Sequence, residues 1–261
     1  MIAVCGGLMR TGSIAMWQVM REIVLKDGGR APALGSYFLK DANKWAKENK
    51  WVLVRLHEYD NFLEEPIGND RCKVVVTIRD QRDVVVSLMN FNNYGFDTAI
   101  HARAFKGNVK NYYEWIEKIG DDDLFIVEYE DFVNHRTRTI LHIAEFLGID
   151  LSKAEAEEIN KKWDIPANQK RAKQHNKLDS VEYMAERHIN SGKANQWKKA
   201  LTEEQVEYIE RDPDVGFWLW DLGYKMHCQN CKKLMDSYDL TWTNDGIFCD
   251  DCPWFELEEE E

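Results

Sequence analysis

The chain has 261 residues, with 34 basic and 46 acidic side chains and therefore a formal net charge of −12 at pH 7. A hydrophobic fraction of 44% excludes a disordered chain, and the lack of any apolar run of about 20 residues excludes a membrane-spanning helix. Because the excess negative charge repels phosphate backbones, we expect a globular protein whose partners include neither nucleic acid nor membrane.

The N-terminal residues lead directly into an apolar strand pattern, without a charged and apolar leader before it. Of the cysteines, four form two Cys-x-x-Cys pairs, and two others, Cys5 and Cys72, lie within apolar strand patterns. Both features favour a reducing, cytoplasmic location for the protein.

Short apolar runs alternate with helical patterns along the chain. The runs predict strands over residues 2–5, 51–56, 73–78 and 124–127. Apolar residues recur at helix spacing over residues 16–24 and 112–119. Two more helix starts are predicted by capping-box spacing, at Ser152 with Glu155 and at Thr202 with Gln205. This alternation predicts an α/β fold with a mainly parallel central sheet.

The later part of the chain has a different character. Residues 164–190 are polar and lysine-rich, so we expect a loop or lid over the ligand-binding end of the sheet. A cysteine-bearing pattern begins after Tyr224, and the chain ends in glutamates that predict a solvated tail. We therefore expect a main domain over residues 1–225, a small module over residues 226–255 and an acidic tail over residues 256–261.

A glycine-containing turn follows the first predicted strand and opens the first predicted helix, with the sequence Gly6-Gly7-Leu8-Met9-Arg10-Thr11-Gly12-Ser13. Backbone N–H groups and the helix dipole at such a turn can bind a nucleotide phosphate, although glycine-rich turns also serve packing alone. Gly7 and Gly12 have the spacing of the kinase-type loop, but Ser13 stands where that loop has lysine. This difference disfavours a nucleoside or nucleotide kinase.

Two Cys-x-x-Cys pairs, Cys228 with Cys231 and Cys249 with Cys252, have the spacing of a four-thiolate zinc site. Few residues remain with which the module could build a core, so a structural zinc ion would supply much of its folding energy. Disulfides are the alternative. Because the cysteines lie far from the glycine-containing turn in sequence, we expect Cys231→Ser to unfold the module and to leave nucleotide binding measurable.

Four segments, in matching order and spacing over residues 1–211, resemble the sulfotransferases that use 3′-phosphoadenosine-5′-phosphosulfate (PAPS). Residues 9–13 resemble that family's 5′-phosphosulfate loop, and residues 75–87 resemble its 3′-phosphate motif, in which Arg79 and Ser87 have the required spacing. Glu128-Tyr129-Glu130-Asp131-Phe132 is similar to its Tyr-Glu-Asp-Leu strand end. Residues 192–198 are similar to its late Gly-x-x-Gly-x-Trp-Lys segment.

The resemblance implies a P-loop-like three-layer fold, with PAPS as co-substrate and 3′-phosphoadenosine-5′-phosphate (PAP) as product. It implies that Arg10 neutralises the leaving 5′-phosphate, which is cradled by Thr11, Gly12, Ser13 and Ile14. Arg79 and Ser87 would converge on the 3′-phosphate. The other implied nucleotide contacts are Tyr129, Gly192 and Lys193. Arg82 is expected on the outer side of the helix after Arg79.

The strand pattern over residues 51–56 runs into Arg55-Leu56-His57, which is similar to the Lys-Thr-His strand end of cytosolic-type members. The similarity implies that His57 is the general base on the acceptor hydroxyl, and that Arg55 stabilises charge on the migrating sulfuryl group. A structural role for His57 is the alternative, with His188 as the second candidate base. Ala15 replaces the tryptophan that stacks on adenine in the family, so adenine stacking stays unassigned.

These features together predict a PAPS-dependent sulfotransferase that acts on a hydroxyl of a small-molecule acceptor, with phenols among the options. A carbohydrate sulfotransferase is one alternative. A nucleotide-binding zinc-ribbon adaptor without turnover is the other.

Overall fold

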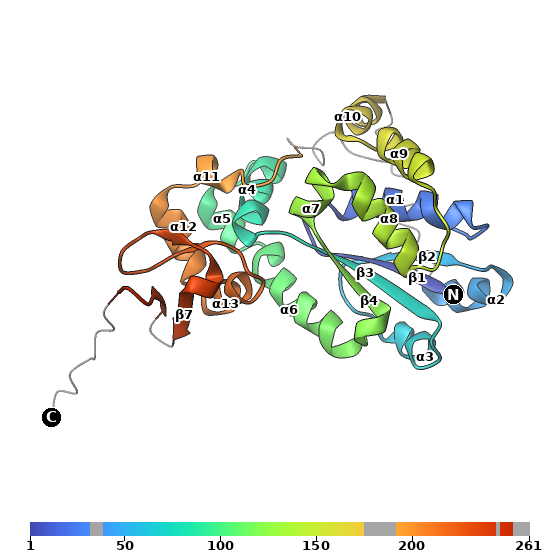
Figure 1. The fold of residues 1–261 in the computed structure, drawn as a ribbon, viewed down its shortest axis with the longest axis horizontal. Coiled ribbons are helices and arrows are strands. Elements are labelled where there is room, and N and C mark those ends of the chain that lie inside the picture. The colour runs from blue at the N-terminus through green and yellow to red at the C-terminus, as the bar shows by residue number, and fades with distance from the viewer. Residues whose placement is uncertain (32–38, 175–191, 244–245, 253–261) are drawn as a thin grey trace.

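Figure 1 shows the computed structural model of the chain, which describes residues 1–31, 39–174, 192–243 and 246–252. At its centre lies a four-stranded sheet in the order β2-β1-β3-β4, with every neighbouring pair parallel. The predicted strands and the parallel sheet are confirmed. The strands are β1 (Ile2–Gly7), β2 (Val52–Leu56), β3 (Cys72–Ile78) and β4 (Leu124–Glu128).

The inner strands β1 and β3 are buried on both faces, which explains why they read as nearly continuous apolar runs, whereas the edge strand β4 is partly exposed. Successive side chains of a strand point to opposite faces. In β1, Ile2 and Val4 belong to one apolar core, whereas Ala3 and Cys5 belong to a second. Each core therefore holds one helical layer against the sheet, so the molecule has the three layers that its sequence predicts.

One face is covered by helices that share the core of Ala3 and Cys5: α1 (Ser13–Lys26), α7 (Tyr129–Asn134), α8 (Arg136–Phe146) and α9 (Lys153–Lys162). The other face shares the core of Ile2 and Val4 with helices that include α4 (Gln81–Asn92), α5 (Phe96–Ile100), α6 (Arg103–Lys118) and α13 (Pro213–Asp221). The remaining helical elements are α2 (Leu39–Glu48), η1 (Asn61–Leu63), α3 (Glu64–Ile67), η2 (Asp121–Asp123), α10 (Ile165–Gln174), α11 (Trp197–Ala200), α12 (Glu203–Glu210) and η4 (Ser237–Asp239). None of the helices in the described part of the chain is long and apolar enough to cross a membrane.

Both predicted capping boxes are present, at the starts of α9 and α12. The expectation of a loop over residues 164–190 is wrong for its first part, which forms α10. Asp164 accepts a hydrogen bond from the backbone N–H of Ala167 at 2.7 Å, and Pro166 lies in the first turn, where a missing N–H costs little. Residues 175–191, including His188, lie outside the described residues.

The cysteine-bearing end forms two short antiparallel pairs, β5 (Met226–His227) with β6 (Leu234–Met235) and β7 (Leu240–Thr243) with β8 (Gly246–Cys249). It does not bury its apolar residues separately. Met226 and Ile247 belong to the same core as Trp218 of α13, so the module packs directly on the main domain. The predicted acidic tail lies outside the described residues.

Candidate active site and metal site

A cavity of about 360 Å³ opens at the carboxyl end of the sheet, where β1, β2, β3 and β4 lead into their loops and helices. In open α/β sheets this end is the usual place for ligands. The cavity brings together most of the residues that the sequence singles out: Arg10, Gly12, Ser13, Ile14, Arg55, His57, Arg79, Ser87, Tyr129 and Gly192. Thr11 and Lys193 do not contribute to its lining.

The glycine-containing turn between β1 and α1 has the geometry of an anion cradle. Gly12 caps α1 with a positive φ of 82°, a conformation that favours glycine. A Cβ there would lie 2.9 Å from the ring of Tyr129, so the absence of a side chain also lets Tyr129 approach the turn. Ser13 and Ile14, in the first turn of α1, line the cavity, and the N–H groups of a helix's first turn have no acceptor within the helix.

The Thr11 hydroxyl is used inside the protein rather than in the cavity. Thr11 is 1% exposed, and its Oγ1 donates to the Leu8 carbonyl at 2.8 Å. Its Oγ1 also lies 2.7 Å from the hydroxyl of Thr77 on β3. The side chain therefore ties the turn to the sheet, and any contact from Thr11 to a ligand would come from its backbone.

Arg10 joins the glycine-containing turn to helix α4. Its Nε donates to Ser87 Oγ on α4 at 3.0 Å, and its guanidinium lies 4.1 Å from the centre of the Phe91 ring. The Arg10 backbone has a φ of 67°, which is unusual for a residue with a side chain. The turn thus directs the Arg10 cation across the cavity, toward the helix that follows β3.

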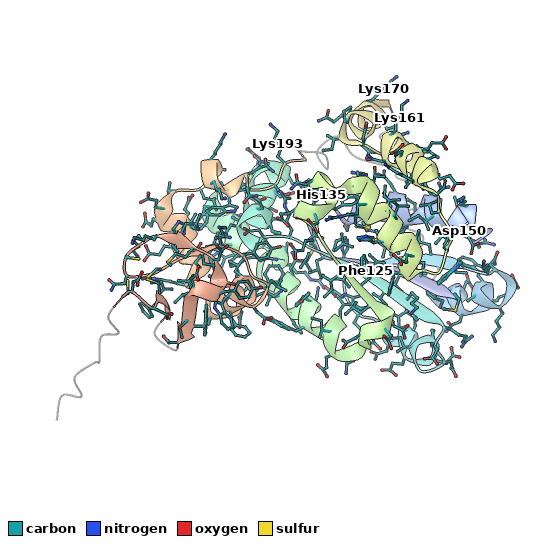
Figure 2. The ribbon with its side chains drawn as sticks, in the orientation of Figure 1. Phe125, His135, Asp150, Lys161, Lys170 and Lys193 are labelled. Atoms are coloured by element: carbon teal, nitrogen blue, oxygen red, sulfur yellow. The ribbon has the colours of Figure 1, made fainter. Side chains whose placement is uncertain are left out.

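Arg79, at the end of β3, is 4% exposed and held from several sides. Its guanidinium donates to Asp83 at 3.3 Å and to the carbonyls of Arg10 at 3.3 Å and Lys193 at 3.2 Å. It also stacks 4.1 Å from the centre of the Tyr129 ring. Lys193 lies on the segment that leads into α11, beside α4 (Figure 2), and it contacts Arg79 through its backbone.

Arg82 is not on the outer side of α4, as the sequence predicts, but is 1% exposed. Its guanidinium forms ion pairs with Asp80 at 2.7 Å and with Glu210 of α12 at 2.6 Å. The sequence carries a partial signal for this arrangement, because arginine and aspartate alternate closely between Arg79 and Asp83. The partner Glu210 lies too far along the chain for that signal to identify it.

Arg55 and His57 meet at the end of β2. The Nη2 of Arg55 lies 2.9 Å from His57 Nε2 and 3.2 Å from Ser13 Oγ, and His57 Nδ1 lies 2.5 Å from the Gly7 carbonyl. Because arginine can only donate and a carbonyl can only accept, Nδ1 carries the proton and Nε2 presents its lone pair. The backbone of the glycine-containing turn thus fixes the tautomer of His57.

Burial lowers the pKa of His57 to about 4, and the positive charge of Arg55 acts in the same direction. His57 is therefore uncharged at neutral pH. Burial also lowers the pKa of Arg55. No carboxylate among the described residues forms an ion pair with Arg55, in contrast to Arg79 with its partner Asp83.

The rest of the lining was not predicted. Ala15 lies in the cavity, whereas Trp17 is 2% exposed in the second core and does not replace the missing tryptophan. Leu88 and Phe91 of α4 form part of an apolar wall together with Met9 and Ala104. Helix spacing could have identified Phe91, because it lies four residues after Ser87 on the same face of α4.

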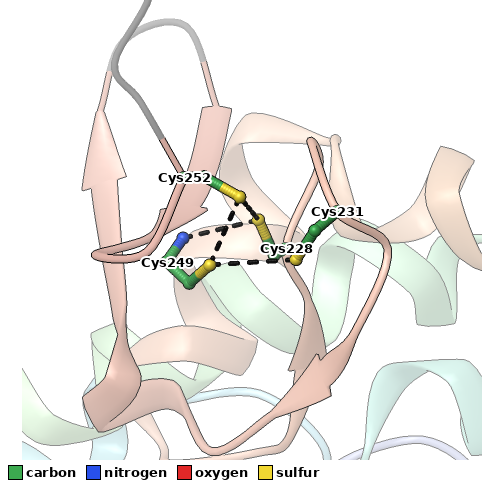
Figure 3. Close-up of side chains that lie close together, drawn as sticks. All are labelled: Cys228, Cys231, Cys249 and Cys252. Carbon is green, nitrogen blue, oxygen red and sulfur yellow. Dashed lines mark hydrogen bonds between the residues drawn. The ribbon is translucent and has the colours of Figure 1, made fainter.

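The four cysteines of the module lie together, as their spacing predicts (Figure 3). Their sulfur atoms all lie within 4.8 Å of one another. Cys228 and Cys252 are 3.6 Å apart, Cys231 and Cys249 3.8 Å, and Cys249 and Cys252 3.4 Å. These distances are far longer than a disulfide of about 2.05 Å. A tetrahedral site with Zn–S bonds of about 2.3 Å places its sulfurs roughly 3.8 Å apart, so this donor set fits zinc.

Comparison with known proteins identifies the family. The family model described as a sulfotransferase domain matches residues 15–226. Sulfotransferase 6B1 of Mus musculus is 25% identical over 209 residues, which cover 72% of this chain and 67% of that protein. Sulfotransferase 4A1 of Homo sapiens is 22% identical over 199 residues, which cover 71% of this chain and 62% of that protein. The chain thus spans less than two thirds of the second relative.

Solved structures share the fold. The crystal structure of mouse sulfotransferase SULT7A1 complexed with PAP superimposes with a TM-score of 0.60 at 17% identity, covering 84% of this chain and 87% of that chain. Retinol dehydratase in complex with androsterone and PAP gives a TM-score of 0.55 at 16% identity, covering 84% of this chain and 79% of that chain. Because the family model spans most of the sequence, the chain belongs to the sulfotransferase family, which confirms the enzyme class that its sequence predicts.

Proposed function

We propose that the chain transfers a sulfuryl group from PAPS to a hydroxyl of a small-molecule acceptor. The observation that carries this proposal is the convergence of three groups on one cavity: the anion cradle with Arg10, the Arg79–Ser87 pair and His57. Each of these groups alone would be weak evidence for the family, because it is their fixed order along the chain that is typical of it. Their meeting at one place supports a shared reaction centre.

The donor would occupy the part of the cavity between the cradle and α4. The N–H groups of α1 and Ser13 bind the 5′-phosphate, and Arg10 supplies a cation against the charge that develops on it. Arg79 and Ser87 bind the 3′-phosphate with charge-assisted hydrogen bonds. Arg10 already contacts Ser87, so both phosphate subsites lie within reach of one arginine.

The acceptor would occupy the rest of the cavity, whose apolar lining includes Met9, Leu88 and Ala104, with its hydroxyl toward His57. This lining suits a small molecule with an apolar body and one reactive oxygen. Retinol dehydratase, which shares the fold, is described in complex with androsterone and with retinol. Those complexes support a small-molecule acceptor rather than a polymer.

In the reaction, the acceptor oxygen attacks the sulfur of PAPS, the bond from sulfur to the 5′-phosphate oxygen breaks, and PAP leaves. The proton of the acceptor hydroxyl passes to Nε2 of His57, which carries the lone pair. Arg55 must then turn from Nε2 toward the sulfuryl group, because it donates to the same lone pair. Arg55 is suited to that role since it has no carboxylate partner among the described residues.

The low pKa of His57, about 4, bears on the class of acceptor. A base this weak removes a proton more readily from a phenol, with a pKa near 10, than from an aliphatic alcohol, whose pKa is higher still. We therefore favour phenols within the class of small-molecule hydroxyls.

We propose further that Cys228, Cys231, Cys249 and Cys252 hold one structural zinc ion. The four thiolates would satisfy a closed tetrahedral site, which leaves no position for catalysis. The module has only strands of two to four residues, so metal binding would contribute much of its folding free energy.

Incubation of the protein with PAPS and a panel of phenols, aliphatic alcohols, amines and sugars tests the first proposal. Mass spectrometry should find a sulfated phenol and stoichiometric PAP. Turnover of sugars alone would instead favour a carbohydrate sulfotransferase, and PAP binding without any product would favour the adaptor. Elemental analysis of protein purified without chelator should find one zinc per chain, and its absence would contradict the zinc proposal.

A further inference from the structure

We propose that the cysteine module positions Arg79 for the 3′-phosphate through the buried ion pairs of Glu210, Arg82 and Asp80. The inference rests on the proposed donor site. It assigns Glu210 and Arg82 as positioning residues, which act on the nucleotide through Arg79. It also makes donor selectivity depend on the module.

The first link joins the module to α12. Glu210 is 1% exposed, and its Oε2 accepts a hydrogen bond from the backbone N–H of His227 at 3.0 Å. The His227 ring lies 3.2 Å from both carboxylate oxygens. Since His227 directly precedes Cys228, the position of the first cysteine and that of Glu210 are tied together.

The second link joins Glu210 to α4. Arg82 donates through Nη1 to Glu210 at 2.6 Å and to the carbonyl of Lys225 at 2.8 Å. It therefore contacts both α12 and the residue that directly precedes β5 of the module. Its Nε and Nη2 donate to Asp80 in a fork. Asp80 caps α4 and directly follows Arg79. An ion pair this deeply buried is costly to break, because a charge would be left without a partner.

A second set of contacts, at Trp197, links the module to the same end of α4. The Arg82 guanidinium lies 4.0 Å from the centre of the Trp197 ring, and the His227 ring meets the same tryptophan edge-on at 6.3 Å. The backbone N–H of Trp197 donates to Asp83 at 2.9 Å, and Asp83 pairs with Arg79. The module therefore reaches Arg79 along two routes, one through Glu210, Arg82 and Asp80, and one through Trp197 and Asp83.

These contacts lead us to expect that disorder of the module weakens donor binding while leaving it measurable. The two are far apart in sequence but are joined by side chains that are almost wholly buried. Loss of the module's order would take from Glu210 its hydrogen bond with His227 and from Arg82 its hydrogen bond with the Lys225 carbonyl. The N-terminal turn of α4 would then no longer hold Arg79 in one pose.

The test compares the affinities of the full chain for PAP and for adenosine 5′-phosphate, which lacks the 3′-phosphate, by calorimetry. Glu210→Gln keeps the size of the side chain and removes its charge. We expect it to weaken PAP binding by about tenfold, as when one charged hydrogen bond is lost, with less than about a twofold change for adenosine 5′-phosphate. Glu207→Gln is the matched control, because Glu207 also lies on α12 and pairs with Lys232 of the module, but on the exposed surface.

Cys231→Ser provides a second route that leaves every member of the ion-pair chain in place. We expect the same selective loss of PAP affinity, and removal of the metal by a chelator should reproduce it. An unchanged ratio of the two affinities in folded Glu210→Gln or in folded, zinc-free Cys231→Ser would overturn the inference. An equal weakening of both nucleotides would also overturn it, since general damage has that effect.

The outcome for the unmodified protein separates this inference from the proposed function. If the wild-type chain binds both nucleotides equally well, the donor site itself is wrongly assigned and the inference fails with it. If the wild type prefers PAP and the variants keep that preference, only the coupling is wrong.

Discussion

The two sides of the cavity hold their arginines in opposite ways. On the proposed donor side, Arg79 pairs with Asp83 and is fixed further by two backbone carbonyls. On the proposed acceptor side, Arg55 contacts a hydroxyl and an uncharged imidazole, and no carboxylate among the described residues balances its charge. A balanced cation is suited to holding a ligand in place, whereas an unbalanced buried cation gains most when negative charge arrives beside it.

In the proposed reaction, similar side chains at the ends of β2 and β3, which flank β1, would therefore serve different steps. Removal of a group from the donor side should lower affinity, and removal of a group from the acceptor side should lower turnover. Three measurements test whether affinity and turnover divide between the two sides in this way.

The largest effect is expected for His57→Ala. Loss of the general base should lower turnover by roughly 100- to 10,000-fold at saturating donor and acceptor, with little change in PAP affinity. Rapid-quench kinetics with a phenolic acceptor would measure the chemical step. His142→Ala is the matched control, since His142 is exposed on α8. Retention of more than about a tenth of the wild-type rate in folded His57→Ala would exclude His57 as the base.

An intermediate effect is expected for Arg79→Ala. PAP binding should weaken by at least about tenfold, because a charged hydrogen bond to the 3′-phosphate is lost, while adenosine 5′-phosphate binding should change little. Calorimetry with both nucleotides measures the difference. Arg138→Ala serves as the control, because Arg138 is exposed and pairs with Asp131. A drop in turnover without a change in PAP affinity would contradict the division between the two sides.

The smallest effect is expected from pH. With a pKa of about 4, His57 keeps its lone pair in more than roughly 95% of molecules from pH 6 to 8, so kcat/KM with a phenol should be nearly flat on the acid side. Activity should fall as the pH drops toward about 4, where His57 takes up a proton. In Arg55→Ala the loss of a nearby positive charge should raise the pKa of His57, so the acid limb of the pH profile should move to higher pH. A wild-type limb near pH 6.5 would show that the histidine is not perturbed as described.

Much of the architecture follows from local patterns in the sequence. The inner strands β1 and β3 are nearly continuous apolar runs because both of their faces are covered, and the capping boxes at Ser152 and Thr202 depend on residues only three positions apart. The cysteine cluster likewise follows from spacing. Such features need no knowledge of distant contacts.

What could not be predicted depends on long-range packing. Arginine is usually a surface residue, and Arg82 is instead buried with Glu210 as its partner, which comes from a helix far along the chain. The contact of Arg55 with Nε2 of His57 depends on how the end of β2 lies beside the turn after β1, where the Gly7 carbonyl accepts a hydrogen bond from Nδ1 of His57. The missed start of α10 is a different case, because Asp164 and Pro166 are ordinary local signals for a helix N-terminus.

The close approach of Gly12 to Tyr129 has a consequence for the variation that this protein can accept. A Cβ at position 12 would lie 2.9 Å from the tyrosine ring, and the φ of 82° would in addition strain any residue other than glycine. A smaller residue at position 129 would relieve the clash but not the strain, and it would remove the ring that stacks on Arg79. A library of single substitutions at position 12 should therefore return almost only glycine, whereas position 129 should accept a residue that keeps the ring.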